Sequence, residues 1–183
     1  MNSDDGLKFE PATAEPIRNE NAYGGIRLRI MAILGKMRIP LQFDVGFGDA
    51  ITPTTDERTW PGMLGYPDTR LTTYPVETAI AEKLEAMVRL GFSNSRMKDF
   101  YDLHWLASHL ELNRRTVRAA IENTFARRQT KLPAASPVAY TPEFYEATAK
   151  VMQWNAFLRK NRLRAPALPD VIATIRTRFP FPL

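Results

Sequence analysis

Two stretches of alternating apolar and polar residues follow one another in the first third of the chain. The apolar positions are Ile26, Leu28 and Ile30 in the first stretch, and Ile39, Leu41, Phe43 and Val45 in the second. A period of two residues sends successive side chains to opposite faces of a strand. A short segment with Gly35 separates the two stretches, so the pattern predicts an antiparallel hairpin.

The segments on either side of this hairpin have no apolar period. Residues 1–24 are polar and contain two prolines, and we expect an irregular lead-in. Residues 46–73 are rich in Gly, Pro, Thr and Asp. Such a composition is typical of a loop with little regular structure.

From residue 75 onward, apolar residues recur at helical spacing. The expected helices are 75–90, 96–109, 114–128, 142–162 and 169–178. Pro75 suits a first turn, Gly91 suits a helix end, and Asn113 can cap the third helix. The predicted fold class is therefore α+β, with a small antiparallel β region in residues 1–73 and a mostly helical lobe in residues 74–183.

Charged residues interrupt the apolar faces of the first two predicted helices. At about 100° per residue, Lys83 projects from the middle of the first apolar stripe, whereas Glu85 lies off its centre. In the next helix, Asp99 projects from the apolar face and Asp102 flanks it. Lysine rarely occupies such a position without a partner or a task. Two interpretations stay open: a structural ion pair, or a polar cleft where Lys83 meets phosphate and the carboxylates meet a metal or a hydroxyl.

Positive charge is concentrated in the C-terminal half of the chain. Residues 1–90 contain 10 Lys/Arg and 13 Asp/Glu, a net charge of −3, whereas residues 91–183 contain 15 and 7, a net charge of +8. The basic residues form groups at Arg114, Arg115 and Arg118, at Arg127, Arg128 and Lys131, and at Arg159, Lys160, Arg162 and Arg164. This asymmetry suits a polyanionic partner such as RNA, and it equally fits a solvated basic surface.

The composition argues against several classes of protein. No cysteine is present, so neither a disulfide framework nor a thiolate metal site is expected. No apolar window has the length of a membrane span, and the first residues do not resemble a signal peptide. A cytoplasmic protein without a membrane partner is therefore expected. Trp60, Trp105 and Trp154 are scattered along the chain, and we expect them to be packing residues and not a platform for stacked bases.

Three short segments carry a family resemblance. Residues 41–49 (LQFDVGFGD), 75–83 (PVETAIAEK) and 96–103 (RMKDFYDL) resemble, in this order, three motifs of AbiEii/AbiGii-type nucleotidyltransferase toxins. The resemblance implies a nucleotidyltransferase-like core with a helical C-terminal lobe. It also implies transfer of a nucleotide from an NTP with a divalent metal such as Mg²⁺, a possible tRNA or other RNA acceptor, and a cognate antitoxin.

The same resemblance assigns roles to the charged residues. Asp44 matches a carboxylate of the metal-binding triad, and Lys83 matches a helical lysine near the triphosphate. Asp99 matches the acidic residue of the last motif, with Asp102 beside it. The candidate catalytic residues are Lys83, Asp99 and Asp102, and the candidate nucleotide-binding residues are Lys83, Arg96 and Lys98. We expect Asp44, Lys83 and Asp99 to converge on one cleft.

The chain departs from the family pattern in one respect. The opening motif of the family, a glycine-containing turn followed by Asp-x-Asp, belongs upstream of the hairpin, where this chain has only the adjacent pair Asp4-Asp5. Two-metal chemistry needs clustered carboxylates. We therefore expect either the downstream portion of a longer or split enzyme, whose partner is the missing N-terminal half, or an inactive remnant. The alternative function is a non-catalytic RNA- or protein-binding helical module that uses the basic C-terminal surface.

Overall fold

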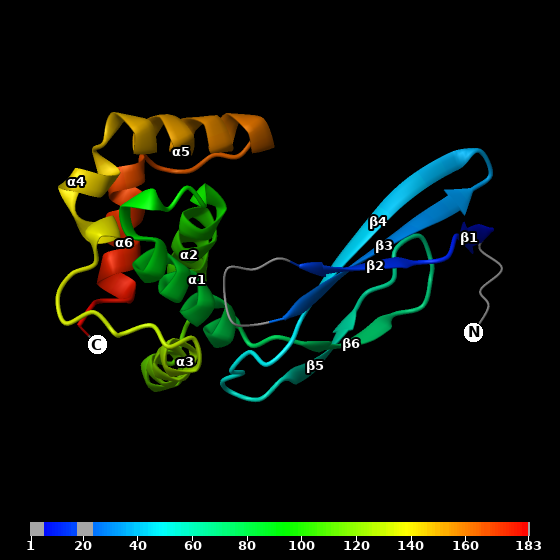
Figure 1. Ribbon diagram of the computed structural model, residues 1–183, viewed down its shortest axis with the longest axis horizontal. Coiled ribbons are helices and arrows are strands. Elements are labelled where there is room, and N and C mark those ends of the chain that lie inside the picture. Colours follow the sequence, from blue (N-terminus) through cyan, green and yellow to red (C-terminus); the bar gives the residue numbers. More distant parts are fainter. Residues whose placement is uncertain (1–5, 18–23, 183) are drawn as a thin grey trace. The chain divides into compact units, whose positions relative to one another are not determined.

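The predicted α+β class is confirmed by the computed structural model, which describes residues 6–17 and 24–182 (Figure 1). The strands precede the helices along the chain. Residues 1–49 and 50–183 form two compact units, here called unit 1 and unit 2.

Unit 1 is an antiparallel sheet built around the predicted hairpin. Strands β3 (Gly25–Leu34) and β4 (Met37–Gly46) pair along their whole length, and the turn contains Gly35 with a positive φ of 59°. Glycine adopts this conformation without a steric penalty. The second edge of β3 pairs with two shorter strands, β1 (Leu7–Phe9) and β2 (Thr13–Ile17).

The prediction that residues 1–24 are irregular was wrong for β1 and β2. Their side chains are almost all exposed, so no buried face imposes an alternating pattern on the sequence. Backbone hydrogen bonds to β3 are what define them, and the edge position of β2 tolerates Pro16. The sequence therefore shows no alternating pattern here, because no face of these two strands is buried.

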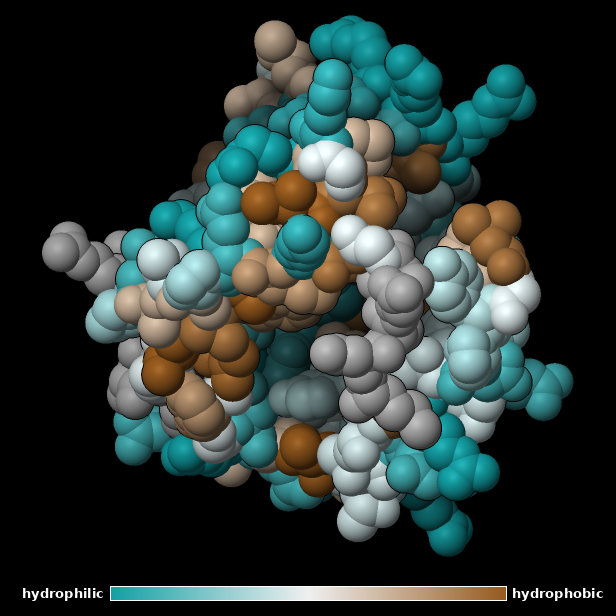
Figure 2. All heavy atoms as spheres, turned by 90° about the vertical axis from the view of Figure 1, so that its right-hand side faces the viewer, coloured by the Kyte–Doolittle hydropathy of each residue, from teal (hydrophilic) through white to brown (hydrophobic). Residues whose placement is uncertain are grey.

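Unit 2 begins with a second hairpin that the sequence did not predict. Strands β5 (Asp56–Trp60) and β6 (Thr69–Thr73) pair in antiparallel register, within the segment expected to be a loop. All five side chains of β5 are exposed, which again removes the alternating pattern. Several apolar side chains in the strand regions are exposed, and Leu64 in the loop between β5 and β6 is one of them. Figure 2 shows hydrophobic residues among hydrophilic ones on one face of the molecule.

Four of the predicted helices are confirmed with ends that differ by one residue. They are α1 (Val76–Leu90), α2 (Met97–His109), α3 (Arg114–Arg127) and α6 (Leu168–Arg178). The Asn113 side chain accepts hydrogen bonds from two backbone N–H groups of the first turn of α3, as predicted. Gly91 ends α1 with a positive φ of 52°, which other residues rarely adopt.

The predicted helix over residues 142–162 was wrong, because the structure divides it in two. A single turn, α4 (Pro142–Tyr145), is separated from α5 (Thr148–Asn161) by extended backbone at Ala147. The break lets Phe144 of α4 and Trp154 of α5 both reach the core, where each is at most 1% exposed. Tertiary packing therefore overrides a segment that has no strong helix-breaking residue.

The hydrophobic core of unit 2 lies among its helices. Helix α1 packs along α3, and α2 packs along α6. The largest side chains with almost no exposed surface are Trp154, Tyr140, Phe100, Phe125, Phe144, Ile80, Leu84 and Met87. In the part of the chain that the structure describes, no helix combines the length and the apolar character needed to cross a membrane.

Candidate functional site

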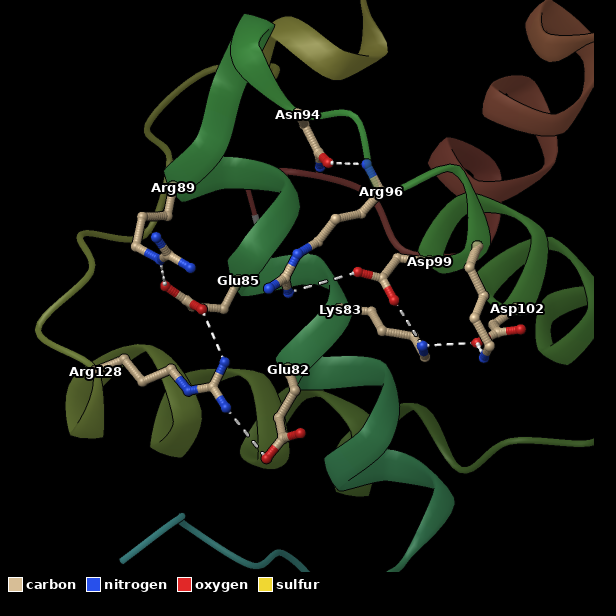
Figure 3. A network of polar contacts seen from close by, with 10 residues as sticks. Glu82, Lys83, Glu85, Arg89, Asn94, Arg96, Asp99, Asp102 and Arg128 are labelled. Atoms are coloured by element: carbon tan, nitrogen blue, oxygen red, sulfur yellow. Dashed lines mark hydrogen bonds and ion pairs between the residues drawn. The ribbon is translucent and has the colours of Figure 1, made fainter. Parts of the chain in front are cut away.

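The ammonium of Lys83 bridges two carboxylates of the next helix (Figure 3). Its Nζ lies 2.8 Å from Asp99 Oδ1 and 2.7 Å from Asp102 Oδ2. The three side chains, here called the Lys83 cluster, are each only about one-fifth exposed. The prediction that Lys83 is not a surface charge and lies near a carboxylate is confirmed.

The short connection between α1 and α2 brings these residues together. A single 3-10 turn, η1 (Gly91–Ser93), follows α1, and residues 94–96 connect it to the start of α2. The Asn94 side chain, which is 1% exposed, accepts a hydrogen bond from the backbone N–H of Arg96. This contact fixes the direction in which α2 begins, and it places Asp99 in the first turn facing α1.

Two further cations border the cluster from the first turn of α2. Lys98 Nζ contacts Asp102 Oδ2 four residues along the helix, and Arg96 Nη1 lies 3.9 Å from Asp99 Oδ2. Both cations are mostly exposed, Lys98 at 71% and Arg96 at 60%. Three cations and two carboxylates give the site a net positive charge, which suits an anionic ligand.

Burial and ion pairing oppose one another in the titration of the cluster. Burial by itself would lower the pKa of Lys83, but hydrogen bonds to Asp102 and Asp99 outweigh it and raise that pKa above its ordinary value. For Asp102, burial acts to raise the pKa, and the hydrogen bonds from Lys83 and Lys98 lower it overall. Both groups are therefore held in their charged forms at neutral pH.

Two depressions adjoin the cluster. One, of about 360 Å³, is lined by Lys83, Tyr101, Asp102, Trp105 and Leu106. The other, of about 530 Å³, lies between the start of α2 and α5, and its lining includes Arg96, Lys98 and Asp99. These volumes fall within the range of small-molecule sites. The Lys83 cluster therefore borders two hollows on the surface of unit 2.

A second polar network on α1 was missed by the sequence reasoning. Glu85 is fully buried, and its carboxylate accepts hydrogen bonds from Arg89 at 3.1 Å, Arg128 at 3.0 Å and Thr130 at 2.7 Å. Arg128 also contacts Glu82 at 3.3 Å (Figure 3). The sequence places Glu85 off the centre of the apolar stripe of α1, and the structure buries it there because α3 and the chain after it cover that side of the helix.

Asp44 lies in unit 1, where its structural partner is Arg27. The two residues are opposite one another on β3 and β4, and the guanidinium donates two hydrogen bonds to the carboxylate at 2.7 and 2.8 Å. These hydrogen bonds lower the pKa of Asp44 and raise that of Arg27. The contacts defined for Asp44 lie within its own sheet, so its convergence with Lys83 stays a prediction.

The side chains of the described residues do not form a complete magnesium site by themselves. Among residues 6–17 and 24–182, no group of three or more His, Asp or Glu side chains is arranged to hold a metal. Mg²⁺ is commonly held by one or two carboxylates together with substrate phosphates. Asp99 and Asp102 each contact Lys83 through one oxygen, and the second oxygen of Asp99 lies 3.9 Å from Arg96 Nη1. Asp4 and Asp5 lie outside the described residues.

The three tryptophans differ in burial. Trp154 is 1% exposed and belongs to the core, as expected. Trp105 is 45% exposed and Trp60 is 53% exposed, so of these three residues a place in the core is confirmed for Trp154 alone. Trp105 directly precedes Leu106, a residue of the apolar face, and successive residues of a helix point about 100° apart. This offset from the apolar face is the sequence signal that could have indicated the exposure of Trp105.

The basic groups are also not equivalent. Arg128 is held by Glu82 and Glu85 and is only 20% exposed, so it does not belong to a solvated basic face. Arg114, Arg115 and Arg118 on α3 are exposed. The residues Arg159, Lys160, Arg162 and Arg164, here called the α5 basic segment, are exposed as well.

Comparison with known proteins gives one match. The family model described as nucleotidyl transferase AbiEii toxin, type IV TA system, matches residues 2–176. No curated protein and no solved structure matches the chain.

Proposed function

The chain belongs to the AbiEii nucleotidyltransferase toxin family of type IV toxin–antitoxin systems, and on this basis we propose that the Lys83 cluster binds the phosphates of an NTP for transfer to RNA. Membership of a toxin–antitoxin family implies a cognate antitoxin. The proposal includes tRNA as the acceptor class and the cytoplasm as the location, since NTPs and tRNA occur together there.

The single observation that carries this proposal is the position of Lys83. Its side chain is four-fifths buried, its ammonium is held between two carboxylates, and the residue borders an open hollow. An ammonium in such a place is already oriented, and a phosphate oxygen that replaces one carboxylate gains a charge-assisted hydrogen bond. Arg96 and Lys98 can add contacts to the same phosphates because they border the cluster.

Mg²⁺ belongs to the proposal through the same two carboxylates. Asp99 and Asp102 would hold the ion together with phosphate oxygens, and the ion would neutralise charge on the phosphates. When Lys83 exchanges one carboxylate for a phosphate, it releases an oxygen of that carboxylate for this role. Exchange of partners by Lys83 is what this chain contributes to metal and nucleotide binding.

The acceptor contact is proposed for the exposed arginines and lysines of unit 2. The α5 basic segment brings four cations together within six residues, and no ion pair within the described part of the chain neutralises them. Contacts between such cations and phosphates release counterions, so binding weakens steeply with salt. Electrostatic attraction of this kind suits a folded RNA.

The 183-residue chain by itself is proposed to bind NTP without transferring it. No Asp-x-Asp occurs anywhere in the sequence, and a pair of carboxylates supports one ion better than two. The test is incorporation of labelled nucleotide into total tRNA, with Mg²⁺ and NTP, by the chain and by Lys83→Ala. We expect no labelling by either protein. Labelling by the chain that Lys83→Ala abolishes would show a complete active site and overturn the proposed inactivity.

A second candidate function, a non-catalytic RNA-binding module, is favoured by the α5 basic segment alone. It needs neither Mg²⁺ nor the Lys83 cluster. RNA binding that is equal with and without NTP, and unchanged in Lys83→Ala, would support this function over nucleotide binding.

A further inference from the structure

Aromatic side chains follow one face of α2 next to the Lys83 cluster. Tyr101, Trp105 and His109 are spaced four residues apart, which places them on one side of a helix. The rings of Trp105 and His109 are stacked, with centroids 4.7 Å apart and planes 12° from parallel. Tyr101 contacts Phe157 of α5 at a centroid distance of 6.0 Å.

Trp105 is not used for packing in the way that Trp154 is. Almost half of its surface is exposed, and the imidazole of His109, itself exposed, supports one side of it. The support limits the orientations of the indole without burying it. A large aromatic ring that is held in place and left accessible is a suitable surface for another flat ring.

The hollow beside Trp105 combines this aromatic surface with the charged cluster. Tyr101 and Trp105 line the same depression as Lys83 and Asp102, and Leu106 adds an apolar side chain. Its volume of about 360 Å³ is at the lower end of the range for small-molecule sites. Cation, carboxylate and indole thus surround one space that can hold both a charged and a flat group.

We propose that the base of a bound nucleotide stacks on Trp105 while Lys83 holds its phosphate. This inference depends on the proposed function of Lys83 and adds a residue that positions the base. The ligand chemistry is a nucleobase joined to a phosphate, and its source is either a free NTP or the terminal nucleotide of an RNA. Stacking uses the π-face that every base has, so Trp105 contributes affinity with little preference among bases.

Binding of three probes in the presence of Mg²⁺ tests the inference. The probes are ATP, tripolyphosphate, which has no base, and a short single-stranded RNA. The variants are Trp105→Ala, Trp105→Phe, and Trp60→Ala as a control at another exposed tryptophan, on β5. We expect Trp105→Ala to weaken ATP binding about tenfold, because the change removes the aromatic face on which the base stacks. Trp105→Phe should retain most of the affinity, and Trp60→Ala should bind as the unchanged protein does.

Tripolyphosphate separates this inference from the proposed function. Its binding should require Lys83 and be the same in Trp105→Ala as in the unchanged protein. If only the RNA probe weakens in Trp105→Ala, the stacked base is that of the acceptor, which supports stacking. Equal ATP and RNA binding by Trp105→Ala and the unchanged protein overturns the inference, even where Lys83 is needed. Failure of both ATP and tripolyphosphate to depend on Lys83 overturns the proposed function and this inference with it.

Discussion

Lys83 and Asp99 lie on different helices, 16 residues apart in sequence, and their side chains meet at 2.8 Å. Asp102 contacts the same ammonium from one turn further along α2. One cation thus pairs with two carboxylates that would otherwise repel one another. The arrangement stabilises the α1–α2 pair. It also places the Lys83 ammonium and two carboxylates at the edge of a hollow.

Glu85→Ala should destabilise unit 2 by about 3 kcal/mol, because it leaves two partly buried arginines without their shared carboxylate. Urea unfolding followed by circular dichroism measures the effect. Glu122→Ala is the matched control, since Glu122 pairs with Arg118 on an exposed face of α3, and its effect should stay below about 1 kcal/mol. Similar losses in the two variants would contradict the importance of the Glu85 network.

Stability should fall as the pH is lowered through the acidic range, in part because of Asp102. The pKa of Asp102 is lower in the folded chain than its ordinary value. Its contribution is therefore present above the unfolded pKa of about 3.9 and is lost as the pH falls through the folded value. Urea unfolding between about pH 3 and pH 7 should show a shallower acid decline for Asp102→Asn than for the unchanged protein. Parallel curves would contradict the ion pairing of Asp102.

The contribution of Lys83 to stability should be lost at alkaline pH, whereas that of Asp102 is lost at acidic pH. Its pKa is raised in the folded chain, so its contribution is complete below the unfolded pKa of about 10.4 and is lost as the pH rises through the folded value. Lys83→Met should be less stable than the unchanged protein at neutral pH, and the difference should shrink at high pH. A difference that stays constant up to alkaline unfolding would count against a charged Lys83 in the folded state.

Removal of three cations from the α5 basic segment should weaken RNA binding and its dependence on salt. For the variant with Arg159→Ala, Arg162→Ala and Arg164→Ala, the slope of log affinity against log salt should decrease by about 2 to 3, because each phosphate contact contributes about 0.7 on a single strand and about 0.9 on a duplex. Filter binding to tRNA at several salt concentrations measures the slope. An unchanged slope would show that RNA contacts another part of the chain.

The sequence predicted those features in which a buried face leaves a periodic pattern of apolar residues. Lys83 and Asp99 were identifiable because each interrupts an apolar helical face, and the β3–β4 hairpin because its apolar residues alternate. Strands β1, β2 and β5 were missed since their side chains are exposed and only backbone hydrogen bonds define them. Glu85 was missed for a different reason. Its burial depends on Arg128 and Thr130, more than 40 residues away in the sequence, and a local helical pattern does not contain that contact.

The central claim is that the Lys83 ammonium binds nucleotide phosphate, and equilibrium dialysis with labelled ATP and Mg²⁺ tests it most directly. The proteins are the unchanged chain, Lys83→Ala and Lys160→Ala, the last being a control at an exposed lysine on α5. Circular dichroism checks that each is folded. We predict that Lys83→Ala binds ATP at least about tenfold more weakly, since a hydrogen bond to a charged group contributes about 1.5–3 kcal/mol, and that Lys160→Ala binds normally. Equal ATP affinity in a folded Lys83→Ala protein and the unchanged chain would contradict the claim.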